Sequence, residues 1–168
     1  AYAPPMRVIT IGTLSKVYWA GLRVGWIHAN PSLIDRMARA KGEADLGTSA
    51  VSQVLAVKLL RREAEAREQR RLSLLAGADH LQELLRGYLP DWTWRTPEGG
   101  GSLWIRLPHG SATGFTQLAR RRGVEMLPGP VFSARGDLDE YIRMPFTAPL
   151  TTLTLATVRL ADAWAQFR

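Results

Sequence analysis

The stretch that decides the fold is ITIGTLSKVYWAGLRVGWI, which occupies residues 9–27. It opens within a short β-branched run, residues 7–11, that ends at Gly12 and predicts a buried strand. The loop TLSK follows, and residues 24–27 predict a second strand. The stretch therefore places a lysine, Lys16, on a tight turn that follows a strand.

The side chains of this turn suit a ligand that carries both an aldehyde and a phosphate. The amine of Lys16 can attack an aldehyde carbon and form an imine. Hydroxyls at Thr13 and Ser15 can bond to phosphate oxygens, and Arg23 can clamp a phosphate with two parallel charge-assisted hydrogen bonds. An aldehyde and a phosphate on one molecule describe pyridoxal 5'-phosphate. Taken alone, this combination of residues is common and favours a structural or surface lysine.

A nucleotide-binding P-loop is poorly supported by the same stretch. The order G-x-x-x-x-G-K-[ST] is missing, since Gly12 lies only four positions before Lys16.

The remainder of the chain predicts alternating helices and strands. Asn30 and Pro31 are a helix start, because Asn caps a helix and Pro fits its first position. Further elements are a helix to about Lys41, a break at residues 42–49, a long helix at about 50–85 bent near Gly77, a strand at 102–107, a helix at 112–122, strands at 124–127 and 141–146, and a last helix at 150–167.

Composition excludes several classes of site. The chain has no cysteine, and its three histidines fit no metal-ligand spacing, so neither a disulfide framework nor a metal centre is expected. No apolar run reaches the length of a membrane span, and the first ten residues do not resemble a signal peptide, so we expect a soluble, cytoplasmic protein. The net charge is +7, but in residues 61–71 arginines alternate with glutamates. That pattern favours a solvated helix face over a polyanion contact.

The segment GTLSKVYWAGLRVGWIHA resembles the lysine segment of fold-type I aminotransferases of class I/II. It is most similar to the aminotransferase-like domain of MocR-type regulators in the GntR superfamily. Later segments match in order: ADLGTSAVSQVLAVKLL, PEGGGSLWIRLP, GVEMLPGPVFSARG and YIRMPFTAP. The resemblance implies an α/β fold: the C-terminal end of a PLP-transferase large domain in residues 1–62, followed by a small α+β domain in residues 63–168 that a long helix enters.

The resemblance also implies roles for single residues. Lys16 would hold pyridoxal 5'-phosphate as a Schiff base and move a proton at the substrate, while Arg23, Ser15 and Thr13 would bind the phosphate. Arg143 sits where the family keeps the arginine that pairs with the α-carboxylate of the amino acid or 2-oxo acid. Arg143 interrupts an apolar strand that should be half buried, where an unpaired charge is costly. On the solvent face of that strand it would have no such role.

Three weaker positions keep two readings each. Thr48 and Ser49 either cap a helix or approach the partner subunit's site in a homodimer. Gly129, with Phe132 after it, either lines the substrate side or only forms the turn Pro128-Gly129-Pro130.

Two functions are consistent with the resemblance. One is amino-group transfer between an amino acid and a 2-oxo acid, in a homodimer. The alternative is a cofactor- and effector-binding domain of a MocR/GntR-type regulator, which would contact DNA only through an N-terminal domain absent here. The family's acidic partner of the pyridine nitrogen precedes the lysine, yet none of the fifteen residues before Lys16 is Asp or Glu. A partial chain without transaminase turnover of its own is therefore expected, and nothing specifies which amino acid binds.

Overall fold

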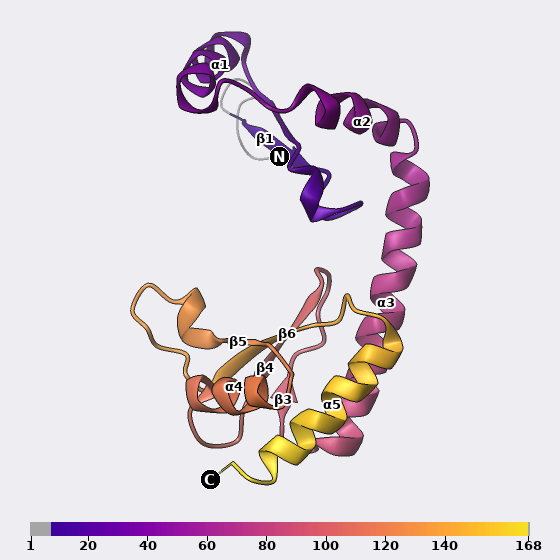
Figure 1. The fold of residues 1–168 in the computed structure, drawn as a ribbon, viewed down its shortest axis with the longest axis vertical. Coiled ribbons are helices and arrows are strands. Elements are labelled where there is room, and N and C mark those ends of the chain that lie inside the picture. Colours follow the sequence, from indigo (N-terminus) through magenta and orange to yellow (C-terminus); the bar gives the residue numbers. More distant parts are fainter. Residues whose placement is uncertain (1–7, 168) are drawn as a thin grey trace. The chain divides into compact units, whose positions relative to one another are not determined.

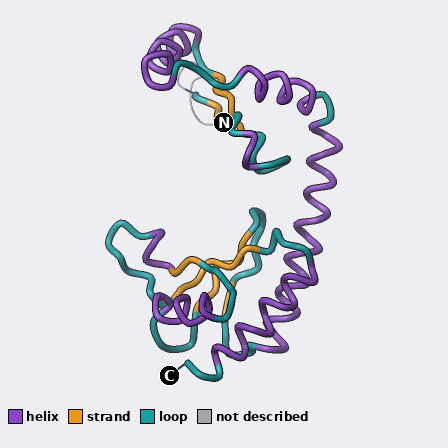
Figure 2. The backbone as a smooth tube through the Cα atoms, viewed as in Figure 1, coloured by secondary structure: helices purple, strands orange, loops and turns teal. Residues whose placement is uncertain are grey.

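A computed structural model describes residues 8–167, which form a mixed α/β chain (Figures 1 and 2). The chain divides into two compact units between Arg70 and Arg71, and helix α3 (Glu63–Tyr88) runs from the first unit into the second. None of the helices in this described part combines the length and apolar character that crossing a membrane requires.

The first unit contains a two-stranded antiparallel ribbon and two helices. Strand β1 pairs with β2 so that Thr10 lies opposite His28 and Thr13 opposite Gly25. A small core of Leu14, Leu22 and Ala56 packs beside the ribbon. The elements are β1 (Thr10–Thr13), the 3-10 turn η2 (Ala20–Leu22), β2 (Gly25–His28), α1 (Pro31–Asp45) and α2 (Ala50–Leu60).

The prediction of a buried first strand is wrong for this structure. Ile11, at the centre of β1, is 75% exposed, and Ile9 precedes the strand instead of belonging to it. Within the described residues β1 has one neighbouring strand, and a two-stranded ribbon buries little apolar surface. Arg7, where the predicted strand begins, lies outside the described residues.

The start of α1 confirms the prediction from Asn30 and Pro31. The Asn30 side chain accepts a hydrogen bond from the Ser32 backbone N–H at 3.0 Å, and Pro31 is the first helical residue. The helix ends later than predicted, at Asp45 rather than near Lys41, and an exposed Lys41–Asp45 ion pair of 2.6 Å joins its last turn. The break itself lies at Leu46, whose φ of 59° is left-handed and incompatible with a continuing helix.

The single long helix of the sequence prediction is in fact two helices. Helix α2 ends at Leu60 and α3 begins at Glu63, with acidic residues in its first turn that suit the positive end of the helix dipole. Gly77, where a bend was predicted, lies inside an unbroken α3. A Cβ on Gly77 would lie 2.3 Å from the carbonyl oxygen of Phe146, so this glycine allows close packing rather than bending.

The arginine-rich face at the start of α3 is solvated and paired, as predicted. Arg62 bonds to Glu65 at 2.8 Å and Arg67 to Glu63 at 2.6 Å, and both arginine side chains are mostly exposed.

The second unit is a four-stranded antiparallel sheet in the order β3-β4-β6-β5, with helices on one face (Figure 1). Leu103 and Ile105 of β4 and Ile142 and Met144 of β6 point into the core. The core is closed by residues of α3, α4 and α5, among them Leu81, Phe115 and Leu160. The elements are β3 (Thr93–Trp94), β4 (Ser102–Arg106), α4 (Ala112–Arg121), β5 (Leu127–Pro128), the 3-10 turn η3 (Gly129–Phe132), β6 (Tyr141–Pro145) and α5 (Leu150–Trp164).

The loop before β6 secures the first turn of α4. Ser111 caps the helix by accepting the Gly114 N–H at 3.1 Å, and the Asp139 carboxylate accepts the Thr113 N–H at 2.8 Å. Hydrogen bonds from the side chains of Ser111 and Thr113 hold the pKa of the Asp139 carboxyl below its ordinary value of 3.8.

Candidate functional site

The turn that carries Lys16 is held at both ends by backbone hydrogen bonds. The Leu14 N–H donates to the Val24 carbonyl at 3.2 Å, and the Tyr18 N–H donates to the Leu14 carbonyl at 2.9 Å. Leu14 is 2% exposed and anchors the turn in the small core. Lys16 lies on the exposed part of this turn, so a buried apolar residue fixes the backbone while the amine stays accessible.

The two hydroxyl groups of the turn have different surroundings. Thr13 Oγ1 accepts the Ser15 N–H at 3.1 Å and donates to the Val24 carbonyl at 3.4 Å, which stabilises the turn. Within the described residues the Ser15 hydroxyl has no hydrogen-bond partner, and the residue is half buried. The Ser15 hydroxyl can therefore donate a hydrogen bond to a ligand, whereas the Thr13 hydroxyl already forms two hydrogen bonds within the turn.

Arg23 has an unusual backbone. Its φ of 52° and ψ of 34° lie in the left-handed region, immediately after the η2 turn, and its N–H donates to the Ala20 carbonyl at 3.4 Å. A residue other than glycine in this conformation is strained by roughly 1–2 kcal/mol, and such strain is concentrated at functional positions. The Arg23 side chain is exposed. In the part of the chain from residue 8 to 167, neither its guanidinium nor the Lys16 amine has a protein partner.

Arg143 lies in the second unit, at the centre of β6. Its Cα partners are Trp104 on β4 and Leu127 on β5, so its side chain is on the sheet face opposite the helices. The residue is half buried, and it lies on the face away from the core of this unit, so its pairing with a substrate carboxylate stays a prediction. Its guanidinium carbon lies 5.7 Å from the centre of the Phe132 ring, a cation–π contact.

The comparison with family models identifies the chain. The model for aminotransferase class I and II matches residues 2–159. The chain belongs to the class I and II aminotransferase family. This confirms the resemblance drawn from the lysine segment and from the segments that follow it.

Relatives and solved structures of this family resemble the chain along nearly its whole length. An aromatic-amino-acid aminotransferase of Thermococcus litoralis is 35% identical over 93% of the chain and 39% of its own length. An uncharacterized HTH-type transcriptional regulator of Bacillus subtilis, YdfD, is 31% identical over 83% of the chain and 30% of its own. The structure of the alpha-aminoadipate aminotransferase LysN of Thermus thermophilus, complexed with N-(5'-phosphopyridoxyl)-L-leucine, gives a TM-score of 0.87 at 29% identity, covering 94% of this chain and 42% of that one. The chain thus spans about two fifths of the length of the aminotransferases it matches.

Four of the expected site residues share one segment of the first unit. Thr13, Ser15, Lys16 and Arg23 all lie on the segment from the end of β1 to the start of β2. Arg143 belongs to the other compact unit.

Sequence reasoning missed a contact that ties the lysine turn to α2. The Tyr18 hydroxyl donates to the Leu59 carbonyl at 2.6 Å, although the two residues are 41 positions apart. The only signal for this contact in the sequence is Tyr18 itself, a tyrosine next to the turn, because a tyrosine hydroxyl in an apolar setting needs a hydrogen-bond partner. Ser49, which had two readings, accepts the Ser52 N–H at 3.4 Å and so caps α2.

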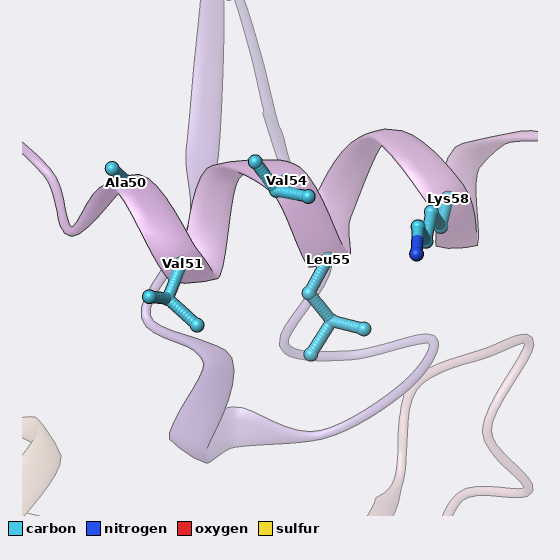
Figure 3. Close-up of a pocket in the computed structure, with 5 residues that line it drawn as sticks. All are labelled: Ala50, Val51, Val54, Leu55 and Lys58. Atoms are coloured by element: carbon cyan, nitrogen blue, oxygen red, sulfur yellow. The ribbon is translucent and has the colours of Figure 1, made fainter.

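Helix α2 also presents an open, apolar hollow of about 450 Å³ (Figure 3). Figure 3 shows Val51 and Leu55 projecting from the same side of the helix, with the Lys58 amine near its end. Its lining is Ala50, Val51, Val54, Leu55 and Lys58. None of the expected site residues lines this hollow.

Proposed function

We propose that the chain carries the cofactor lysine and the substrate carboxylate site of a pyridoxal-phosphate-dependent aminotransferase. The reaction is amino-group transfer between an amino acid and a 2-oxo acid. The observation that carries the proposal is the pair Lys16 and Arg23: two exposed cations without protein partners in the described chain, both on the segment between β1 and β2, with Arg23 on strained backbone. The cofactor-derived ligand of the LysN structure, a phosphopyridoxyl adduct of leucine, supports the choice of cofactor.

The donor set of the turn fits pyridoxal 5'-phosphate. An amine, a hydroxyl and a guanidinium that lack protein partners match an aldehyde carbon and phosphate oxygens. When bound, this cofactor acts as an electron sink for the bonds at the substrate's α-carbon. Lys16 would hold the aldehyde carbon through Nζ with release of water, and its free amine would hold and return the proton of the α-carbon. Arg23 would direct two parallel N–H groups at the phosphate, and Ser15 Oγ would donate a third hydrogen bond.

Thr13 acts on the phosphate site through the backbone. Its hydroxyl accepts the Ser15 N–H and so orients the residue that carries the free hydroxyl. In this proposal Thr13 remains a phosphate-site residue, and its main role is to stabilise the turn that carries Ser15. Arg143 would bind the α-carboxylate of the substrate, because its half-buried guanidinium can form a bidentate pair.

The proposal also includes a domain assignment and an assembly. Residues 1–62 belong to the large, cofactor-binding domain and residues 63–168 to the small domain; the helix break at residues 61–62 supports a boundary there. The functional protein is a homodimer.

The proposal is tested by locating the cofactor on the chain. The chain is mixed with pyridoxal 5'-phosphate, the imine absorbance is recorded, and the imine is reduced with borohydride before peptide mass spectrometry. Label on Lys16, and its loss in Lys16→Ala, is the expected result. Lys41 and Lys58 are the only other lysines. Lys58→Ala is therefore the matched control, and label spread evenly over the three lysines contradicts the proposal.

A regulator is the second candidate, and the similarity to YdfD favours it. In that case the same residues bind cofactor and an amino acid, and the ligand changes the imine absorbance without release of a 2-oxo acid. DNA contact would come from a separate domain. Chromatographic detection of the 2-oxo acid, in protein that carries the rest of the cofactor site, separates the two candidates.

A further inference from the structure

We propose that the open face of the sheet around Arg143 is a carboxylate site with an aromatic wall. It selects ligands that carry a flat aromatic or similarly bulky apolar group beside the carboxylate. This inference rests on the proposed function, which assigns the ligand carboxylate to Arg143, and it adds the class of side chain that the site accepts.

The wall consists of Trp104, Tyr141 and Phe132. Trp104 lies directly opposite Arg143 in the β4–β6 pair, so the two side chains are neighbours on the same face. The Trp104 and Tyr141 rings are stacked, with centroids 5.4 Å apart and planes 13° from parallel. The Phe132 ring meets Trp104 edge-on at 5.6 Å and 83°. Because each ring contacts another, the wall is held in place before a ligand arrives.

Arg143 is oriented by the wall and still has donors to offer. Its guanidinium carbon lies 5.7 Å from the centre of the Phe132 ring, and a cation–π contact does not consume the N–H donors of the guanidinium. Among residues 8–167 no carboxylate or carbonyl accepts a hydrogen bond from it. A half-buried guanidinium with free N–H groups is suited to a bidentate carboxylate.

The wall leaves apolar surface open beside these donors. Phe132 is 47% exposed and Trp104 is 36% exposed, and Leu127 and Val131 extend the apolar surface beside them. Exposed apolar residues that are scattered singly over a surface are normal, whereas a contiguous apolar patch marks an interaction site. The exposed rings next to Arg143 form such a patch and therefore indicate a binding surface. A ligand ring that packs on this surface is removed from water at the same time as its carboxylate is paired.

The charges of the face make an acidic side chain on the ligand the rival to an aromatic one. Strands β4, β5 and β6 carry no Asp or Glu, and Arg106 is the only other cation on β4 or β6. Arg106 lies opposite Tyr141, two positions along the strand from Trp104. A dicarboxylate would use Arg106 as its second partner, whereas an aromatic acid would not need it.

The test measures binding of three simple acids to the full chain by NMR titration. The probes are acetate, 3-phenylpropionate and glutarate. The native chain is expected to bind 3-phenylpropionate about tenfold more tightly than acetate, a difference of about 1.4 kcal/mol. Arg143→Gln should lose all three probes, while Arg106→Gln, the charge-matched control on the same face, should keep the preference. Phe132→Leu and Trp104→Leu should lose the preference but keep acetate, and Phe167→Leu, a ring elsewhere in the unit, should change neither.

The outcomes separate this inference from the proposed function. Equal affinity for acetate and 3-phenylpropionate, with both lost in Arg143→Gln, overturns the aromatic selectivity and leaves the carboxylate site intact. The aromatic selectivity is also overturned if glutarate binds most tightly of the three probes and Arg106→Gln loses that binding. Binding of 3-phenylpropionate that survives Arg143→Gln overturns it as well, while the labelling of Lys16 remains an independent measure of the cofactor proposal. Circular dichroism of each variant confirms the fold, and Phe132 lies on an exposed turn where substitution leaves the core untouched.

Discussion

Replacing Gly77 with alanine should destabilise the second unit, although the same change usually stabilises a helix. Gly77 lies inside α3, where the helix packs against the end of β6. An added Cβ would lie 2.3 Å from the Phe146 carbonyl oxygen, about 1 Å short of ordinary contact at 3.4 Å. The obstacle is the backbone directly after the inner strand β6, so no side-chain rotation can relieve it.

The expected change in the free energy of unfolding for Gly77→Ala follows from two opposing effects. Alanine is favoured over glycine in a helix interior by up to about 1 kcal/mol. Overpacking a tight contact typically costs about 1–3 kcal/mol, and a rigid backbone partner argues for the upper part of this range. We therefore expect Gly77→Ala to lower the free energy of unfolding by roughly 2 kcal/mol, which corresponds to a Tm lower by about 4–8 °C.

Gly87 supplies a control in the same helix. It is exposed, and a Cβ there meets nothing within 4 Å. Gly87→Ala should be neutral or stabilising by up to about 1 kcal/mol. Urea unfolding followed by circular dichroism compares the two variants. If Gly77→Ala proves as stable as Gly87→Ala, the close packing of α3 on β6 is refuted.

Further predictions concern the site and its supports. Asp139→Asn keeps an oxygen acceptor but removes the carboxylate charge from the hydrogen bonds at the start of α4, so it should lower the free energy of unfolding by up to about 1 kcal/mol at pH 7. Because the folded pKa of Asp139 lies below 3.8, this stabilisation is present above that pH and lost as pH falls through the folded pKa. The difference in free energy of unfolding between the variant and the native chain, measured by urea titration, should therefore narrow below about pH 4. Tyr18→Phe removes the hydrogen bond to the Leu59 carbonyl and should cost about 0.5–1.5 kcal/mol in the first unit, measured by thermal unfolding; an unchanged Tm argues against that contact. Arg23→Gly should relieve the strain of the left-handed backbone at this position and stabilise the chain by up to about 1 kcal/mol. The same variant should bind pyridoxal phosphate more weakly in an absorbance titration. Equal or tighter binding would contradict the role of Arg23 at the phosphate.

Local signals predicted a large part of the fold. The helix start at Asn30, the strand around Trp104 and the strand around Arg143 all follow from residues that are neighbours in the chain. The lysine turn was predicted for the same reason, because Thr13, Ser15, Lys16 and Arg23 stand within a dozen positions of one another. Capping, strand patterning and turn chemistry act over a few residues, so they can be read without knowing what packs against them.

What the sequence by itself determined is thus the family, the order of most elements and the segment that presents Lys16. Tertiary structure alone decided that Gly77 meets the Phe146 carbonyl, that Tyr18 bonds to Leu59, and that aromatic rings surround Arg143. The partners in these contacts lie far apart along the chain, from 11 positions for Arg143 and Phe132 to 69 for Gly77 and Phe146. Such contacts depend on which surfaces the folded backbone brings together, and no local pattern of residues encodes that pairing.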